Sequence, residues 1–172
     1  MVLGKVEEPI LWRERIALIV VGHSFKQFEE NVFDYILYPL AIAGLGGVAG
    51  GFVMTVASAL ECWLFIRFYD WSKKDWLGLE LLKEVRDGEE RTFFQRIAQK
   101  GDWLAFLFMS FTTDPFMTTV YMRKGREEYN GLSSRDWKIF WASVVVGNVG
   151  WTIIVTLAIT GFSLLYRWLG FN

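Results

Sequence analysis

The sequence predicts an all-α integral membrane protein with a single membrane domain over residues 1–172, and three observations predict this class. First, 53% of the residues are apolar and only 22% are charged. Second, Tyr35 to Leu60 and Ile139 to Tyr166 form stretches of 26 and 28 residues without a charged side chain. Each is longer than the roughly 18 to 20 apolar residues that cross a hydrocarbon core. Third, an apolar segment between them contains Asp114 and Pro115, which predicts a re-entrant hairpin beside a few transmembrane helices, a glycine-rich broken helix and amphipathic interfacial helices.

The composition excludes several classes of function. The chain has 18 basic and 19 acidic residues and a net charge of -1, which argues against a nucleic-acid binder held by phosphate neutralisation. Its single cysteine, Cys62, and single histidine, His23, permit no internal disulfide and no Cys/His zinc site. We therefore expect no metal, no cofactor and no nucleic-acid partner.

Residues 1–34 are predicted to form an interfacial N-terminal segment. Apolar residues recur near helical spacing, at Ile16, Ile19, Val20, Phe28 and Val32. Charged residues lie between them, at Glu14, Lys26, Glu29 and Glu30. Such an amphipathic helix fits a membrane surface, and it fits equally well a solvated helix docked on the rest of the protein.

Residues 35–67 are predicted to form a glycine-rich membrane segment. As one helix this segment would be about 48 Å long, well beyond the membrane thickness, so it must bend, tilt or break. Pro39 and the glycine run at 44–51 supply the places for a break. Whether the segment crosses once or forms a hairpin plus a span stays open. Two overlapping Gly-x-x-x-Gly pairs occur in this run, Gly46 with Gly50 and Gly47 with Gly51. They predict close packing against another helix, and a role in a substrate path is the alternative.

Residues 68–102 are predicted to form a cytoplasmic amphipathic linker. Two short helices near the membrane surface are expected there, with Trp71 and Trp76 in the headgroup layer; a solvated helical loop is the alternative. The apolar residues that suggest the two helices are Leu77, Leu81, Leu82 and Val85, followed by Phe93, Phe94 and Ile97.

Residues 103–122 decide the predicted topology. Basic residues flank this segment on both sides, and such residues mark the cytoplasmic face. A spanning helix would place one basic loop outside. A re-entrant hairpin that enters and leaves from the cytoplasm avoids this, provided that its tip at Asp114 is buried in protein or faces water. A kinked full span is the alternative.

Residues 137–168 are predicted to form a transmembrane helix. Basic and aromatic residues bound this apolar stretch at both ends. In its first half, Gly147 and Gly150 form a small-residue face that favours helix packing, and the Asn148 amide is placed to bond across that face.

The candidates for a substrate or ion path are polar residues in apolar surroundings: Asp114, Pro115, Thr113, Thr118, Asn148 and Glu61. An intramembrane carboxylate such as Asp114 is costly and is a functional-site candidate by default. The structural alternative makes Asp114 a helix N-cap with Pro115 at the first helical position. For Glu61 the alternatives are an interfacial pair with a basic residue and proton coupling.

Catalytic motifs are not visible in the sequence. It contains no nucleophile elbow, no zinc-protease motif and no phosphate-binding glycine loop. We therefore do not expect an enzyme.

The order of features resembles the DedA-type membrane proteins, whose domain is also called the VTT or SNARE-associated Golgi protein domain. The resemblance covers residues 33–165 and rests on the glycine-rich stretch at 43–51, the linker ending in Lys100-Gly101, Pro115 in the polar hairpin, and Phe140 followed by Gly147 and Trp151. It implies paired re-entrant hairpins and lipid translocation or scrambling. The family's hairpin typically carries arginines around its proline, whereas residues 103–122 contain none and carry Asp114.

These features together predict a small transporter-like or lipid-translocating membrane protein. We expect the hairpin tip at Asp114-Pro115 to meet the glycine-rich segment near the membrane midplane. The alternative is a non-transporting membrane subunit or assembly factor that docks partner helices through its glycine-rich faces. The expected partners are the lipid bilayer and either a second copy of the chain or another membrane protein. The absence of a glycosylation acceptor favours a bacterial inner membrane.

Overall fold

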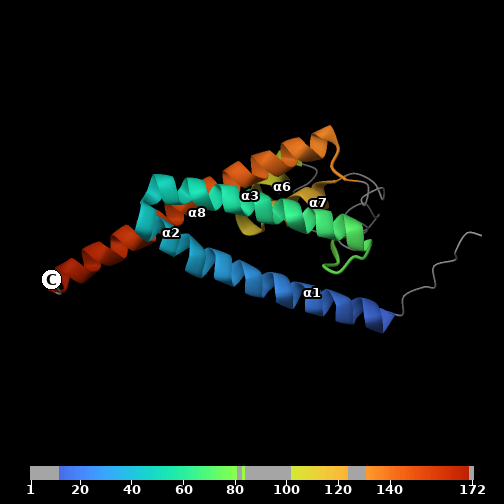
Figure 1. Cartoon of the computed structure of the whole chain (residues 1–172), viewed down its shortest axis with the longest axis horizontal. Coiled ribbons are helices and arrows are strands. Elements are labelled where there is room, and N and C mark those ends of the chain that lie inside the picture. Colours follow the sequence, from blue (N-terminus) through green and yellow to red (C-terminus); the bar gives the residue numbers. More distant parts are fainter. Residues whose placement is uncertain (1–11, 81–82, 84–101, 124–130, 171–172) are drawn as a thin grey trace, which may run out of the picture.

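The computed structural model describes residues 12–80, 83, 102–123 and 131–170, and the regular elements within these ranges are all helical. In chain order they are α1 (Trp12–Val32), the π-helical turn η1 (Phe33–Leu37), α2 (Tyr38–Leu45), α3 (Gly47–Ser72), α6 (Asp102–Thr112), α7 (Pro115–Met122) and α8 (Ser134–Trp168). Figure 1 shows α1 and α2 running on one side of α3, with α8 and the short helices α6 and α7 on the other. The all-α class is confirmed.

The first three elements form one continuous helical rod from residue 12 to residue 45. Pro39 lies in the first turn of α2, directly after the π-helical turn η1, so the helical hydrogen bonding changes where proline cannot donate one. The predicted boundary at residue 34 is therefore not a boundary between elements. The predicted interfacial segment continues directly into the glycine-rich segment.

The chain reverses at Gly46, between α2 and α3. Gly46 has a φ of 83°, a left-handed conformation that favours glycine. α3 then packs back along α2 and also contacts α8. The predicted segment 35–67 is thus a helical hairpin with its turn at Gly46. Among the helices that the structure describes, α3 and α8 are long and apolar enough to cross a membrane.

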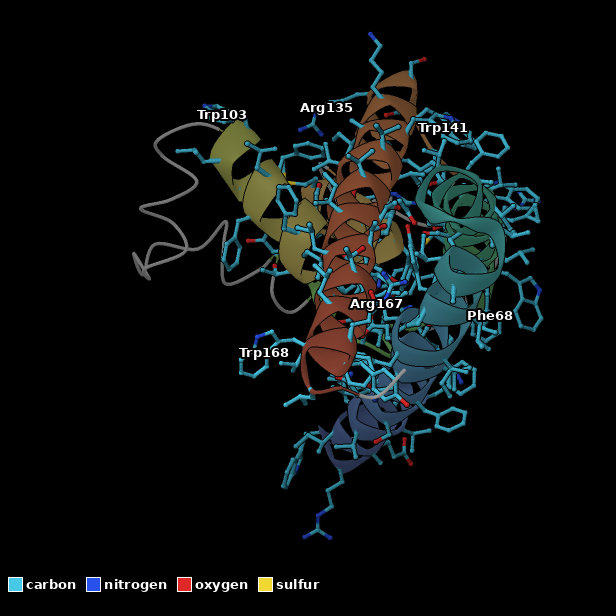
Figure 2. The ribbon with its side chains drawn as sticks, turned by 90° about the vertical axis from the view of Figure 1, so that its left-hand side faces the viewer. Phe68, Trp103, Arg135, Trp141, Arg167 and Trp168 are labelled. Atoms are coloured by element: carbon cyan, nitrogen blue, oxygen red, sulfur yellow. The ribbon has the colours of Figure 1, made fainter. Side chains whose placement is uncertain are left out.

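The predicted hairpin segment is two helices, α6 and α7, separated by Thr113 and Asp114. α7 returns to the end of the molecule where α3 ends and α8 begins. There Arg123 pairs with Asp70 of α3 at 2.8 Å, and the Arg135 guanidinium donates to the Met122 carbonyl at 2.9 Å. Trp103 of α6 and Arg135 of α8 both lie toward the top of the view in Figure 2.

Two hydrophobic clusters hold the helices together. The larger joins α3, α7 and α8 to the segment after α3, and Tyr69, Trp76, Phe116 and Phe140 belong to it. The smaller joins α2, α3 and α8 near the Gly46 turn and contains Tyr38, Ile42, Met54 and Val155.

The linker differs from prediction at one tryptophan. Trp76 was predicted to lie in the headgroup layer, but it is buried. It is only 8% exposed, because its ring stacks on Phe116. Trp71 is 77% exposed. Most of the predicted amphipathic helices, including Leu81, Leu82, Val85 and residues 93–97, lie outside the described residues.

The last part of α8 extends beyond the other helices (Figure 1). Every residue from 160 to 169 is exposed. Most of its side chains are apolar, so this part of the helix presents an apolar surface.

Candidate functional site

A buried lysine lies at the centre of the molecule. Lys26 of α1 is 3% exposed. Its Nζ lies 2.6 Å from Oδ2 of Asp114, contacts the Glu29 carboxylate and lies 3.6 Å from Oε1 of Glu30. Because residues three and four apart share one face of a helix, α1 presents Lys26, Glu29 and Glu30 together. The Lys26 ammonium also lies over the ring of Phe65, 4.8 Å from its centroid.

The partner carboxylate, Asp114, serves two contacts with two different oxygens. It is the N-cap of α7, where Oδ1 accepts a hydrogen bond of 2.6 Å from the Met117 amide, and Pro115 occupies the first turn. Oδ2 pairs with Lys26. The cap role and the charged role that the sequence left as alternatives are thus both present in the geometry.

The threonines beside Asp114 face each other across the break between α6 and α7. Their hydroxyl oxygens, Oγ1 of Thr113 and Oγ1 of Thr118, are 3.1 Å apart. Thr113 also donates to the Met109 carbonyl at 2.8 Å. These two hydroxyls therefore bridge the hairpin tip.

A cavity of about 350 Å³ opens around these groups. It carries one lysine and five carboxylates, contributed by Glu29, Glu30, Asp34, Glu61 and Asp114. Exposed residues of its rim lie on both sides, with Asn31 and Tyr35 from the α1–η1 rod and Thr112 from the end of α6. The cavity is therefore acidic and reachable from outside.

Two acidic side chains of the cavity, Glu29 of α1 and Glu61 of α3, lie close to each other. Carboxylates side by side repel each other unless a cation or a proton lies between them. The cavity thus places a bound ammonium beside a pair of neighbouring carboxyl groups.

The inner wall of the cavity is a hydrogen-bond network centred on Asn148. Its amide nitrogen donates to Oγ of Ser58 at 3.2 Å and to the Val144 carbonyl at 2.8 Å. The Tyr38 hydroxyl lies 3.3 Å from the Asn148 side-chain oxygen and 2.8 Å from Oγ1 of Thr152. The network links α2, α3 and α8, so Asn148 bonds across a helix packing face within this chain.

The hairpin tip meets the predicted segment 35–67 through α3, but not at its glycines. A Cβ on Gly50 would lie 2.5 Å from the Ala41 carbonyl oxygen, whereas Cβ atoms on Gly47 and Gly51 would meet Thr156 and Thr152 of α8. A Cβ on Gly46 would meet nothing within 4 Å. These glycines lie at the α2–α3 turn, one end of α3, whereas Asp114 lies beside the middle of that helix, near Ser58, Glu61 and Cys62.

The glycines of α8 are those that approach the hairpin. A Cβ on Gly147 would lie 2.9 Å from the Ser110 carbonyl oxygen, and one on Gly150 would lie 2.6 Å from the Phe111 ring. Gly147 and Asn148 both line the cavity. The structure therefore brings Asp114, Pro115, Thr113, Asn148 and Glu61 around one cavity, and Thr118 beside it.

The basic residue that directly follows α7 does not pair with Asp114. The Arg123 guanidinium instead binds Asp70 through two contacts, at 2.8 and 3.4 Å. Lys26, the actual partner, was not among the predicted site residues; its signal is a lysine followed three and four positions later by glutamates on one face of an amphipathic helix.

The arrangement suits an ammonium or a proton better than a metal ion. Among the described residues, no group of three or more His, Cys, Asp or Glu side chains could hold a metal ion together. The carboxylates instead surround a primary ammonium, which donates hydrogen bonds in several directions and packs on an aromatic ring.

Comparison of the chain with protein-family models, curated proteins and solved structures finds no match.

Proposed function

We propose that the protein is a small membrane transporter that binds a cation in its acidic cavity and exchanges it for a proton. The observation that carries the proposal is the buried Lys26 ammonium, held by Asp114 and Glu29 and placed over Phe65. A cavity that already stabilises one ammonium has the chemistry to bind another cation. Its five acidic side chains outnumber its single lysine, so negative charge remains for an added cation even when Glu29 and Glu61 hold one proton.

The exchanged proton is placed on the neighbouring pair Glu29 and Glu61. An incoming cation is stabilised by a fully ionised pair, so its binding releases that proton, and protonation of the pair expels the cation. The two species compete for the same carboxylates. Such competition is sufficient to couple their movements in opposite directions.

The proposed setting is a bacterial inner membrane. α3 and α8 have the length and hydropathy to cross it, and the α1–α2 rod lies along α3. In this setting α6 and α7 form the re-entrant hairpin, with its non-helical tip inside the protein, where irregular backbone is tolerated. Broken helices that meet at a polar site are the usual architecture of secondary transporters.

Lipid translocation, which the DedA-type resemblance implies, is the less favoured form of transport. The helical hairpin at Asp114-Pro115 supports it. The acidic lining opposes it, because a lipid phosphate beside five carboxylates would be repelled. We therefore propose a cationic substrate.

Flux in proteoliposomes tests the proposal. Protein in vesicles with an imposed pH gradient is expected to take up ethylammonium and to release protons. Asp114→Asn is expected to reduce the initial rate at least about tenfold, which corresponds to roughly 1.4 kcal/mol. The matched control is Glu14→Gln, the same kind of charge removal at an exposed residue remote from the cavity. Wild-type flux in Asp114→Asn would contradict the proposal.

The second candidate function is that of a membrane subunit or assembly factor. The exposed apolar end of α8 favours it, with Phe162 at 72% and Trp168 at 83% exposure. The glycine faces do not, since Gly50, Gly51 and Gly150 pack against residues of this chain. If this function holds, Phe162→Cys is expected to form a stoichiometric crosslink to a partner in native membranes, whereas Val145→Cys, earlier on α8 and 54% exposed, does not.

A further inference from the structure

An apolar groove lies between α1 and α3, beside the acidic cavity. Its volume is about 650 Å³, and side chains of both helices line it, among them Val21, Phe25, Leu64 and Phe68. Each of these four residues is half exposed or more. The described helices therefore leave an apolar channel open along α3.

The groove and the cavity share a wall. Glu61 lines both. Phe65 lines the groove and also carries the Lys26 ammonium over its ring. At the far end the groove reaches Ser72, and α3 rises about 16 Å from Glu61 to that residue. A molecule lying in the groove would thus have one end at the carboxylates and an apolar body of roughly this length.

A second, independent feature indicates a ligand in the cavity. Ser110 is 2% exposed, lines the cavity, and its hydroxyl has no hydrogen-bond partner among the described residues. A buried hydroxyl without a partner is unfavourable and rare in folded proteins. A ligand with N–H donors close to Asp114 would satisfy it.

We infer that the ligand of this site is a single-chain amphipathic ammonium compound. Its ammonium group lies in the cavity near Glu61 and Asp114, within reach of the Ser110 hydroxyl. Its apolar chain lies in the groove and extends toward Ser72. The inference deepens the proposed function and rests on the cation site; it adds the chemical class of the substrate.

Charge excludes the other amphiphiles. An anionic head group would meet the carboxylates, and Lys26, the lysine of the cavity, is already paired with Asp114 and Glu29. Phosphatidylethanolamine carries an ammonium, but its phosphate would be held next to that ammonium and therefore next to Glu61. The site therefore favours an ammonium with no anionic group attached to it.

Binding to purified protein in phosphatidylcholine nanodiscs tests the inference, with empty nanodiscs subtracted. Dodecylammonium is expected to bind at least about tenfold more tightly than ethylammonium, because burial of methylene groups in the groove adds affinity. Dodecyl sulfate is expected to show no saturable binding. Nanodiscs that contain phosphatidylethanolamine are expected to give the same dodecylammonium affinity.

Paired variants test whether the apolar chain of the ligand lies in the groove. Leu64→Trp fills the groove, so the affinity for dodecylammonium is expected to exceed that for ethylammonium by less than threefold. Leu60→Trp is the control, since Leu60 is equally exposed on α3 but lines a different groove. Val21→Trp on α1 repeats the test from the opposite wall, with Val20→Trp as its control, because Val20 is exposed and does not line the groove.

The outcomes separate the two proposals. Equal affinities for the two amines, saturable binding of dodecyl sulfate, loss of binding in phosphatidylethanolamine, or an unchanged preference in both Leu64→Trp and Val21→Trp would overturn the inference. With saturable ethylammonium flux, each of these results leaves the proposed function standing. Conversely, preferential dodecylammonium binding without any flux would support the ligand class and contradict transport.

Discussion

At the scale of single residues, Lys26 is the position on which the site depends. An isolated ammonium buried to 3% exposure would be strongly unfavourable, so its carboxylate partners and its charge are needed together. The reverse also holds: without Lys26, the carboxylates of Asp114 and Glu29 are left close together in a buried place. The ion pair therefore decides the stability of this region as well as its chemistry.

Lys26→Met is expected to destabilise the protein by about 3 kcal/mol or more, since it leaves buried carboxylates without their partner. The measurement is the free energy of unfolding in mixed micelles. Adding Asp114→Asn to Lys26→Met is expected to restore part of the loss, because it removes one of the unpaired charges. Lys74→Met, at an exposed position, serves as the control and should leave stability unchanged. A strictly additive double variant would show that the two side chains do not interact.

The two oxygens of Asp114 predict different effects for two substitutions. Asn retains an oxygen that caps α7 at the Met117 amide, whereas Ala does not. Asp114→Ala is therefore expected to be less stable than Asp114→Asn by about 0.5 to 2 kcal/mol. Both variants lose the charge that faces Lys26, so both are expected to lose transport. An active Asp114→Asn protein would assign Asp114 to a structural role only.

At the scale of elements, the glycines of the α2–α3 turn differ in what they contact. Gly50→Ala places a Cβ against the Ala41 carbonyl, so the two helices must separate, and a loss of about 1 to 3 kcal/mol is expected. Gly44→Ala is the control, because a Cβ at Gly44 meets nothing within 4 Å. It should be neutral or stabilising by up to about 1 kcal/mol, from helix propensity alone. The measurement is the melting temperature of the two variants in the same detergent, which is expected to be lower for Gly50→Ala. Equal melting temperatures would refute the packing argument.

The elements that the sequence predicted well are those with local signals. The break at Asp114 follows from an N-cap residue followed by proline, and a run of glycines in an apolar stretch marks where the chain can break near Gly46. That this break is a full reversal of the chain was left open by the sequence. The Lys26–Asp114 pair joins helices far apart in the sequence, and no local pattern says which faces of two helices meet. The burial of Trp76 was missed for the same reason, since its partner Phe116 lies on a distant helix.

At the scale of the whole molecule, several helix ends meet at one end of the bundle. Asp70 at the end of α3 pairs with Arg123 after α7, and Arg135 at the start of α8 bonds Met122. At the start of α1, Arg15 lies 3.8 Å from Asp75, which follows α3. The Gly46 turn lies at the other end, and α8 runs past it. If α3 and α8 cross a membrane, these two ends face its opposite sides.

Cysteine labelling tests this topology. In a Cys62→Ser background, single cysteines at Lys74 and Ser134 are expected to react with an impermeant maleimide from the same side, because both lie at the end where α3 stops and α8 starts. A cysteine at Leu169 is expected to react only from the other side, because the 35-residue helix α8, about 50 Å long, separates it from Ser134. Lys74 and Ser134 labelled from opposite sides would mean that α6 and α7 together cross the membrane. Ser134 and Leu169 labelled from the same side would mean that α8 does not.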